Sequence, residues 1–383
     1  MTHALSTAFS THRQGPVRST GPSDQIASLD GLRAISILLV VVSHAGLSHI
    51  VPGRLGVTIF FFLSGYLITT LVLREYEATG TISIGQFYAR RAFRLMPPLL
   101  ITLAIAYSLT YLGVLAGGIS LNGLLAQTFY FANYYMIFTD GAPDTPFGTG
   151  LLWSLAVEEH FYLAYPFVLL LLLTTVKSRG KVAAAFAAIC LAVLAWRIHL
   201  IQQPGVGEPR LAFASDTRID SLLYGCLLAI VKNPLHDLRP SDRIQGRHWA
   251  LLAAGLGLMA STLLIRNWHF RETVRYSIQG LALAPLFYLA IRFAHQGPFR
   301  LLNVPVAKRI GVFSYSIYLI HEVAIGLITY FAPTVATRPL LLLPIVLAMS
   351  IAFSVLIDKL VDPYFRRLRS QFRPVISAGI AST

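Results

Sequence analysis

Ionisable side chains interrupt several long apolar runs of this sequence, where a charge is costly. These residues are His44, Glu158, Glu159, His160, Arg197, His199, His321 and Glu322. An ionised group within a membrane span costs roughly 2.5–3.5 kcal/mol on insertion scales, so each marks a candidate functional site. A histidine can be neutral there, accept a proton, and act as a base or as a carrier of an acyl group. The alternative for each residue is a hydrogen bond that only joins two helices.

Arg33 and His44 lie on one face of a predicted helix. On a helix their separation is about three turns and 16 Å, with Arg33 at one mouth and His44 past mid-membrane. Glu158 enters from the opposite side in LLWSLAVEEHFYL, roughly 10 Å deep, which matches the expected height of His44. A carboxylate bonded to an imidazole fixes its tautomer and stabilises its charged form. We therefore expect Glu158 to orient His44; a structural pair between helices is the alternative.

Three arginines gather in QFYARRAFRLMPP at the start of another apolar run. Arg90, Arg91 and Arg94 stand beside aromatic residues, and guanidinium groups bind phosphate in a bidentate manner. The cluster favours a phosphorylated ligand. The alternative is a topogenic or lipid-headgroup cluster.

The remaining polar residues allow weaker interpretations. His321 and Glu322 could line the same cavity or form a separate polar pair, and Ser64–Gly65 favours close helix packing. Asp216, Arg218 and Asp220 could bind sugar hydroxyls at the outer mouth of a span, or pair with one another. Cys190 and Cys226 lie in apolar runs, which argues against a disulfide or a metal centre. The sequence also lacks the phosphate-binding loop, dinucleotide and HExxH motifs.

The elements that position these groups must be membrane helices, because the chain is far more apolar than a soluble protein. Of its 383 residues, 55% are hydrophobic and 13% charged, and the mean hydropathy is +0.64. A membrane helix needs about 20 mainly apolar residues. Ten segments qualify: 33–50, 55–73, 97–116, 151–175, 182–203, 216–231, 249–266, 276–293, 310–332 and 339–358. We predict an all-α polytopic membrane protein with ten transmembrane helices.

The charge distribution decides how an eleventh apolar segment, 120–138, is interpreted. With ten spans and a cytoplasmic N-terminus, most of the 31 Lys and Arg residues fall on the cytoplasmic side, as the positive-inside rule requires. An eleventh span would reverse every later loop and place more positive charge outside. We predict that 120–138 is a re-entrant or interfacial helix and that both termini are cytoplasmic. The net charge of +14 then belongs to loops, and nucleic acid is not an expected partner.

Six blocks of the sequence, taken in order, resemble the membrane-bound acyltransferase-3 family. They are LDGLRAISILLVVVSHAG, GVTIFFFLSGYLITTLV, ISIGQFYARRAFRLMPP, WSLAVEEHFYL, RIDSLLYGCLLA and SYSIYLIH, and the match runs from about Asp30 to Tyr364. Members O-acetylate lipopolysaccharide O-antigen, exopolysaccharide, peptidoglycan and related acceptors. The resemblance implies residence in a bacterial inner membrane, acetyl-CoA or another acyl-CoA as the cytoplasmic donor, and a carbohydrate or glycolipid acceptor. The positions of the cysteines and the lack of an HExxH motif predict a site without metal.

The family's motifs carry over residue by residue. Its Arg-x10-His motif falls on Arg33 and His44, its basic motif on Arg90, Arg91 and Arg94, and its WSLxVEE block on Trp153, Ser154 and Glu158. In the family the histidine is taken as catalytic and the arginines as the residues that bind CoA. The block often continues VEEQFY, where this chain has His160, so a further titratable group is expected near the site.

These observations predict three regions and leave two rival functions open. We expect a flexible cytoplasmic arm over 1–29, an acyltransferase domain over 30–364 without a fused periplasmic hydrolase-like domain, and a basic cytoplasmic tail over 365–383. The expected function is acyl transfer to a carbohydrate hydroxyl, with homo-oligomers or polysaccharide-assembly proteins as further partners. The rivals are a proton-coupled transporter that uses the same buried groups, and a non-catalytic scaffold of a polysaccharide assembly complex.

Overall fold

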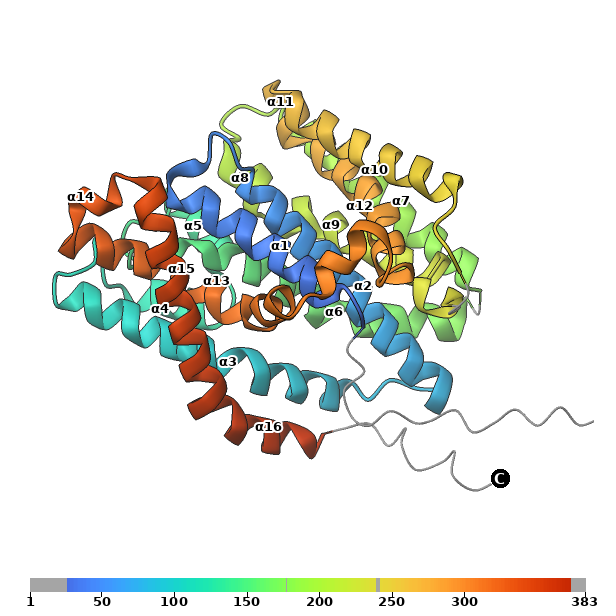
Figure 1. Ribbon diagram of the computed structural model, residues 1–383, viewed down its shortest axis with the longest axis horizontal. Helices are drawn as coiled ribbons and strands as arrows, with labels where there is room; N and C mark the ends of the chain where they lie inside the picture. The colour runs from blue at the N-terminus through green and yellow to red at the C-terminus, as the bar shows by residue number, and fades with distance from the viewer. Residues whose placement is uncertain (1–25, 177, 239–241, 373–383) are drawn as a thin grey trace, which may run out of the picture.

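The computed structural model describes residues 26–176, 178–238 and 242–372, and this part of the chain is helical with no β-strand (Figure 1). Eight of its helical segments are long and apolar enough to cross a membrane: α1 with η1 (Leu29–Leu47), α2 (Gly53–Thr79), α3 (Ile84–Tyr111), η2 with α6 (Gly150–Thr175), α7 (Arg179–Leu200), α12 (Val274–Arg292), α13 (Pro305–Phe331), and α15 with η5 and α16 (Pro339–Ser370). The prediction of an all-α polytopic membrane protein is confirmed.

Two of the ten predicted spans form helices that fall just short of the length or the mean hydropathy of a membrane span. α9 (Ser215–Val231) has 17 residues, about 26 Å of helix against a hydrocarbon core of about 30 Å. α10 (Gly246–Leu264) is longer, but Arg247 and His248 in its first turn lower its mean hydropathy. Each of the ten predicted segments therefore coincides with a helix, and eight of them qualify as spans by length and apolarity.

The segment 120–138 does not form a spanning helix. It folds into α4 (Leu121–Thr128) and α5 (Ala132–Phe138), each only about 10–12 Å long. The two helices are separated at Tyr130, whose φ of 61° lies in the left-handed region and interrupts a helix. The prediction that this segment is not an eleventh span is confirmed. Its position relative to the bilayer stays a prediction.

Glycines allow the central helices to approach one another closely. A Cβ atom at Gly65 of α2 would lie 1.9 Å from the carbonyl oxygen of Leu222 in α9. The contact is reciprocal, because a Cβ at Gly225 would lie 2.0 Å from the carbonyl oxygen of Phe62. Small residues at such crossings are the usual means of helix packing in membranes. The expected packing role of the Ser64–Gly65 pair is thus realised at Gly65.

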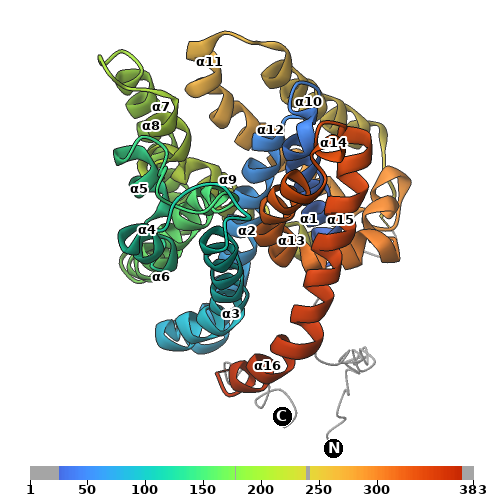
Figure 2. The same ribbon diagram turned by 90° about the vertical axis from the view of Figure 1, so that its left-hand side faces the viewer.

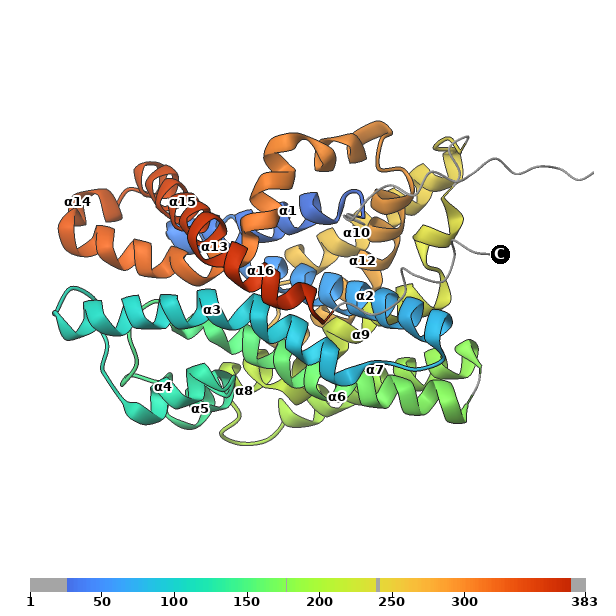
Figure 3. The same cartoon turned by 90° about the horizontal axis from the view of Figure 1, so that it is seen from below.

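Short helices connect the long ones and frame the two ends of the bundle. They are α8 (Glu208–Phe213), α11 (Trp268–Glu272), α14 (Pro333–Ala336), η3 (Pro234–Asp237) and η4 (Gly297–Asn303). Figure 2 shows α16 beside α3, on the side of the molecule away from α11. Seen from below, α3 lies between the α13–α16 group and the α4–α6 group (Figure 3).

The boundary predicted between domain and tail, after residue 364, stays a prediction. It falls inside α16 (Asp362–Ser370), which packs on α3 through Phe93 against Phe365 and Phe372. Arg90 also donates a hydrogen bond of 2.7 Å to the carbonyl oxygen of Phe372. The tail residues up to 372 are therefore part of the bundle, because their aromatic side chains find a partner on α3.

The predicted arm over 1–29 lies mostly outside the described residues. Its described end is packed, since the Ser28 amide donates a 2.8 Å hydrogen bond to Asn303 and Leu29 is buried. The bundle thus begins before residue 30.

Candidate functional site

A cavity of about 760 Å³ opens among α2, α3, α6, α13 and α16. All four arginines expected to bind a donor line it: Arg33, Arg90, Arg91 and Arg94. Arg366 and Arg369 from α16 line it too. We call the end of the bundle that holds these six arginines the basic end. The arginine motifs, which are far apart in the sequence, thus contribute to a single cavity.

Most of these arginines have a carboxylate partner. Arg91 lies 3.0 Å from Glu159 and its guanidinium carbon lies 3.3 Å from the centre of the Tyr162 ring. Arg90 lies 3.6 Å from Glu75. Arg33 of α1 lies 2.9 Å from Asp30, and Arg366 pairs with Asp358. These pairs hold the guanidinium groups in place along the cavity wall.

Arg94 differs from the others because no carboxylate of the described residues lies within ion-pair distance of it. Its side chain is exposed to the cavity. The charged groups whose fields act on it include Arg33, Arg91 and Arg369, which all carry the same sign. Like charges in a partly desolvated site repel strongly, so this part of the cavity is electropositive.

The inner end of the cavity carries hydroxyl groups and one carboxylate. Ser64 of α2 donates a short hydrogen bond to Glu158 of α6, and Tyr162 donates another of 3.3 Å to the same carboxylate. Beside them, the Ser154 and Tyr318 hydroxyls are 2.6 Å apart. All of these residues line the cavity. Glu158 therefore lines the cavity, where its carboxylate accepts hydrogen bonds from Ser64 and Tyr162.

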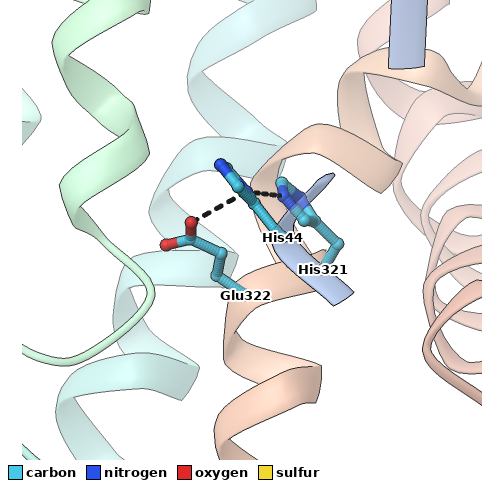
Figure 4. A group of neighbouring side chains, drawn as sticks. All are labelled: His44, His321 and Glu322. Atoms are coloured by element: carbon cyan, nitrogen blue, oxygen red, sulfur yellow. Dashed lines mark hydrogen bonds and ion pairs between the residues drawn. The ribbon is translucent and has the colours of Figure 1, made fainter. Parts of the chain in front are cut away.

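His44 lies in the π-helical turn η1 (Ser43–Leu47) that ends α1. Figure 4 shows it facing His321 and Glu322, both from α13. Its Nδ1 atom is 2.9 Å from Nε2 of His321 and 2.9 Å from Oε1 of Glu322. The turn contains Gly46, whose φ of 94° favours glycine. The prediction that Glu158 orients His44 is thus wrong: the pair His321–Glu322 occupies that place.

His321 is fully buried, whereas His44 and Glu322 reach the surface of the site, with 36% and 21% of their side chains exposed. Tyr318, one helical turn before His321 on α13, lies between this pair of histidines and the cavity. Its ring centre is 5.8 Å from that of His321, and its hydroxyl contacts Ser154 on the cavity wall. His44 can therefore be approached from outside the cavity, and Tyr318 separates it from the basic end.

The three side chains His44, His321 and Glu322 could also hold a metal ion. Their ligand atoms all lie within 4.8 Å of one another, and two imidazoles with a carboxylate form a donor set that zinc accepts. The expectation of a site without metal stays a prediction.

The outer-mouth residues of α9 do not form an open sugar site. Asp220 and Arg197 are both fully buried and joined by two hydrogen bonds of 2.9 and 2.7 Å. Arg218 is also fully buried, with its guanidinium carbon 4.0 Å from the centre of the Tyr276 ring. Asp216 pairs with Arg210 at 2.5 Å. Sugar binding at Arg218 and Asp220 stays a prediction, and in the structure both side chains are engaged inside the bundle.

Trp153 and His160 also contribute to packing. Trp153 is buried, with its ring centre 4.7 Å from that of Phe213. His160 accepts or donates a 2.6 Å hydrogen bond with Ser215 of α9, so its polar contact is to the neighbouring helix.

The sequence profile of acyltransferase 3, described as an acyltransferase domain, matches residues 26–359. The chain belongs to the acyltransferase-3 family. It is 30% identical over 353 residues to a Staphylococcus aureus (strain COL) protein named "Putative O-acetyltransferase", a match that covers 89% of this chain and 57% of the relative. It is also 30% identical over 313 residues to the peptidoglycan O-acetyltransferase OatA of Listeria monocytogenes, covering 79% of this chain and 50% of OatA.

This acyltransferase-3 chain thus spans about half the length of the curated relatives it matches. No solved structure matches it.

Three groups of this candidate site were not predicted as such. Tyr318 could have been found from SYSIYLIHE, because residues three apart share a helix face and Tyr318 precedes His321 by three. Glu322 was expected either to line the same cavity or to form a polar pair with His321, and its contact with His44 was not predicted. Arg366 and Arg369 were assigned to the tail, and only the fold of α16 against α3 brings them to the cavity.

Proposed function

We propose that this acyltransferase-3 chain transfers an acyl group, in the first place acetyl, from cytoplasmic acyl-CoA to a hydroxyl of a carbohydrate or glycolipid acceptor. The observation that supports it best is the cavity at the basic end, where Arg94 faces an open space among Arg33, Arg91 and Arg369. CoA carries several phosphate charges on a long flexible arm. Its phosphates would neutralise this cluster, since arginine binds phosphate oxygens in pairs.

The basic end would face the cytoplasm in this proposal, where acyl-CoA is available. The donor's arm would extend past Ser64 and Glu158 to Ser154 and Tyr318. Tyr318 separates that point from His321 and His44, so rotation of its side chain would open the path for the thioester. The acceptor would approach the exposed side of His44 from the opposite end of the bundle, as O-antigen, exopolysaccharide or a lipid-linked glycan would at the outer face of a bacterial inner membrane.

His44 would then act in one of two ways. It would remove the proton from the acceptor hydroxyl while the oxygen attacks the acyl carbonyl, or it would first carry the acyl group itself. In both routes the carbon–sulfur bond of the thioester breaks and the thiol leaves as free CoA. Ping-pong kinetics distinguish the second route from the first.

The proposal is tested by purified protein in liposomes with labelled acetyl-CoA inside and a polysaccharide extract outside. Label in the glycan supports acyl transfer. A proton-coupled transporter would instead move substrate in liposomes that contain no CoA, and a scaffold would do neither. Replacement of Arg90 and Arg91 by Gln further distinguishes an enzyme from a scaffold. At normal protein levels, only an enzyme would lose function in this variant.

A further inference from the structure

We infer that His44 reacts through its Nε2 atom, and that His321 and Glu322 are positioning residues that hold the proton on Nδ1. The inference rests on the proposed function, and it adds which nitrogen reacts and what keeps that nitrogen free of a proton. It is carried by the contacts of the two imidazole rings with each other and with the backbone of α13.

The backbone of α13 sets the tautomer of His321. Its Nδ1 atom lies 2.7 Å from the carbonyl oxygen of Tyr318 and 3.2 Å from that of Ile317. A carbonyl oxygen can only accept a hydrogen bond, so Nδ1 must carry the proton. In the neutral ring the other nitrogen, Nε2, is then an acceptor. Such a second hydrogen bond is the usual means by which a protein selects a histidine tautomer.

The two rings point nitrogen to nitrogen. Their planes differ by 10° and their centres are 5.2 Å apart, while Nδ1 of His44 is 2.9 Å from Nε2 of His321. A ring atom lies about 1.2 Å from the centre of an imidazole, given ring bonds of roughly 1.3–1.4 Å. The 2.9 Å contact and two such radii together account for the separation of the centres, so both nitrogens lie on the line that joins the rings. This is the geometry of a straight hydrogen bond.

His44 must therefore donate from Nδ1, because His321 can only accept there. The carboxylate of Glu322 lies beside the same nitrogen, with Oε1 2.9 Å from Nδ1. The proton of His44 is directed at His321, the negative charge of Glu322 favours a proton on that nitrogen, and Nε2 is left with its lone pair. No other ionisable side chain of the described residues contacts His44: α15 packs against this turn with Pro339, near Gly46, which carries no charge.

The same geometry disfavours a metal bridge between the histidines. Zinc binds histidine nitrogen at about 2.0–2.1 Å, so two nitrogens 2.9 Å apart would subtend about 90° at the ion, and their lone pairs would have to converge off the line that joins them. Here the nitrogens face each other along that line. A metal ion is thus the alternative that the test must exclude.

The chemical step balances with Nε2 as the reactive atom. As a base, Nε2 takes the acceptor's hydroxyl proton while the oxygen forms the new ester bond, the carbon–sulfur bond breaks, and the imidazolium returns the proton to the thiolate. As a nucleophile, Nε2 forms the carbon–nitrogen bond and the thiolate leaves. The acceptor oxygen then attacks the acyl group, the carbon–nitrogen bond breaks to regenerate the imidazole, and the hydroxyl proton goes to the thiolate, which leaves as free CoA. In both routes the ring becomes a cation, and the carboxylate of Glu322 stabilises that charge.

The test compares three variants in the liposome assay. Glu322→Gln keeps a hydrogen-bonding group and removes the charge, and we expect kcat to fall about 100-fold or more while KM for acyl-CoA changes less than threefold. His321→Gln places an amide oxygen near the position of Nε2 and should retain at least about a tenth of kcat, whereas His321→Phe should lose about 100-fold. Asp140→Asn, at an exposed position, is the matched control and should leave both constants unchanged.

A readout besides activity is the ¹⁵N spectrum of histidine-labelled protein, with His44 assigned by difference against His44→Gln. We expect a protonated Nδ1 and an unprotonated Nε2 in the wild type. The inference is overturned if Nε2 carries the proton, or if Glu322→Gln and His321→Phe retain full kcat while His44→Ala has none. Stoichiometric metal in the purified protein, with activity lost on chelation, would also overturn it. Full activity of His44→Ala would contradict the proposed function itself.

Discussion

At the basic end, the positive charge of Arg94 is repelled by neighbouring arginines, and a bound anion would reduce that repulsion. Arg94 faces the cavity and is surrounded by Arg33, Arg91 and Arg369 without a carboxylate within ion-pair distance among the described residues. In the empty protein these charges repel, and in a complex with an anion they attract it. Binding and stability should therefore respond in opposite directions when Arg94 is neutralised.

Arg94→Gln should weaken donor binding without destabilising the protein. Loss of one guanidinium contact to phosphate costs about 1.5–3 kcal/mol, so we expect KM for acyl-CoA to rise roughly 10- to 100-fold. The melting temperature of the purified protein without donor should stay the same or rise, because a repulsion is removed. Arg309→Gln, at an exposed position of α13, is the control. A lower melting temperature with unchanged KM would show that Arg94 is structural.

The sequence predicts most of the arginines that line the cavity and only part of the cluster around His44. The four arginines could be predicted because a cluster of guanidinium groups is visible in the sequence. Glu158 has the depth expected of a partner for His44, but depth does not tell which way α6 turns, and the side chain faces Ser64. Glu322, which does contact His44, is adjacent to His321 in the sequence. Only the packing of α1 against α13 brings Glu322 into contact with His44.

At the scale of helices, ion pairs and glycines hold the bundle around the cavity. The pair Arg197–Asp220 joins α7 to α9 and is fully buried, whereas Arg179–Glu77 joins α7 to α2 at the surface with nearly half of each side chain exposed. The energetic value of an ion pair depends on its burial, so these two pairs should behave differently.

Asp220→Asn should destabilise the protein strongly. Removing one partner of a buried pair leaves an uncompensated charge and costs about 3–5 kcal/mol. Glu77→Gln should cost less than about 1 kcal/mol, as surface pairs do. Both are measured by reversible unfolding in mixed micelles. Equal losses for the two variants would contradict the structural role that we assign to Arg197 and Asp220.

Gly65→Ala should separate α2 from α9 and destabilise the bundle. Its Cβ would overlap the backbone at Leu222, which cannot move aside as a side chain can. We expect a loss of about 1–3 kcal/mol, typical of overpacking, in the same unfolding assay. Gly257→Ala on α10 meets nothing within 4 Å and should be neutral or slightly stabilising. A neutral Gly65→Ala would show that the two helices are not in this contact.

The elements themselves were largely predictable, and their ends were not. Apolar runs of about 20 residues predict each long helix, and charge alone argued correctly against a span over 120–138. Tyr130 interrupts that segment because its φ is positive, and no local sequence pattern predicts a positive φ at this tyrosine. The extension of the bundle into α16 depends on a contact between Phe93 and two later aromatic residues, and such distant pairs are not visible in a single sequence.

At the scale of the whole molecule, the proposed mechanism requires one fixed orientation of the helix bundle in the membrane. The basic end should face the cytoplasm, where acyl-CoA is available, and His44 should be open to the opposite side. The two native cysteines are buried. Labelling of a cysteine introduced at an exposed position therefore shows on which side of the membrane that position lies.

Ser370→Cys in α16 should react with an impermeant maleimide only after the cells are permeabilised. Phe138→Cys, at the end of α5, should react in intact cells. Accessibility is measured by the mass shift of the protein on a gel. The reverse pattern would place the arginine cavity outside the cytoplasm and remove the basis for an acyl-CoA donor.

We propose that His44 transfers an acyl group from an anionic donor bound at the arginine cavity. The most direct measurement is the initial rate of label transfer from acetyl-CoA to polysaccharide by proteoliposomes that carry equal amounts of wild-type protein, His44→Ala, or His269→Ala, whose side chain is exposed on α11. The account predicts transfer by the wild type and His269→Ala, and a loss of at least about 100-fold in His44→Ala. Equal rates in all three proteins would contradict it.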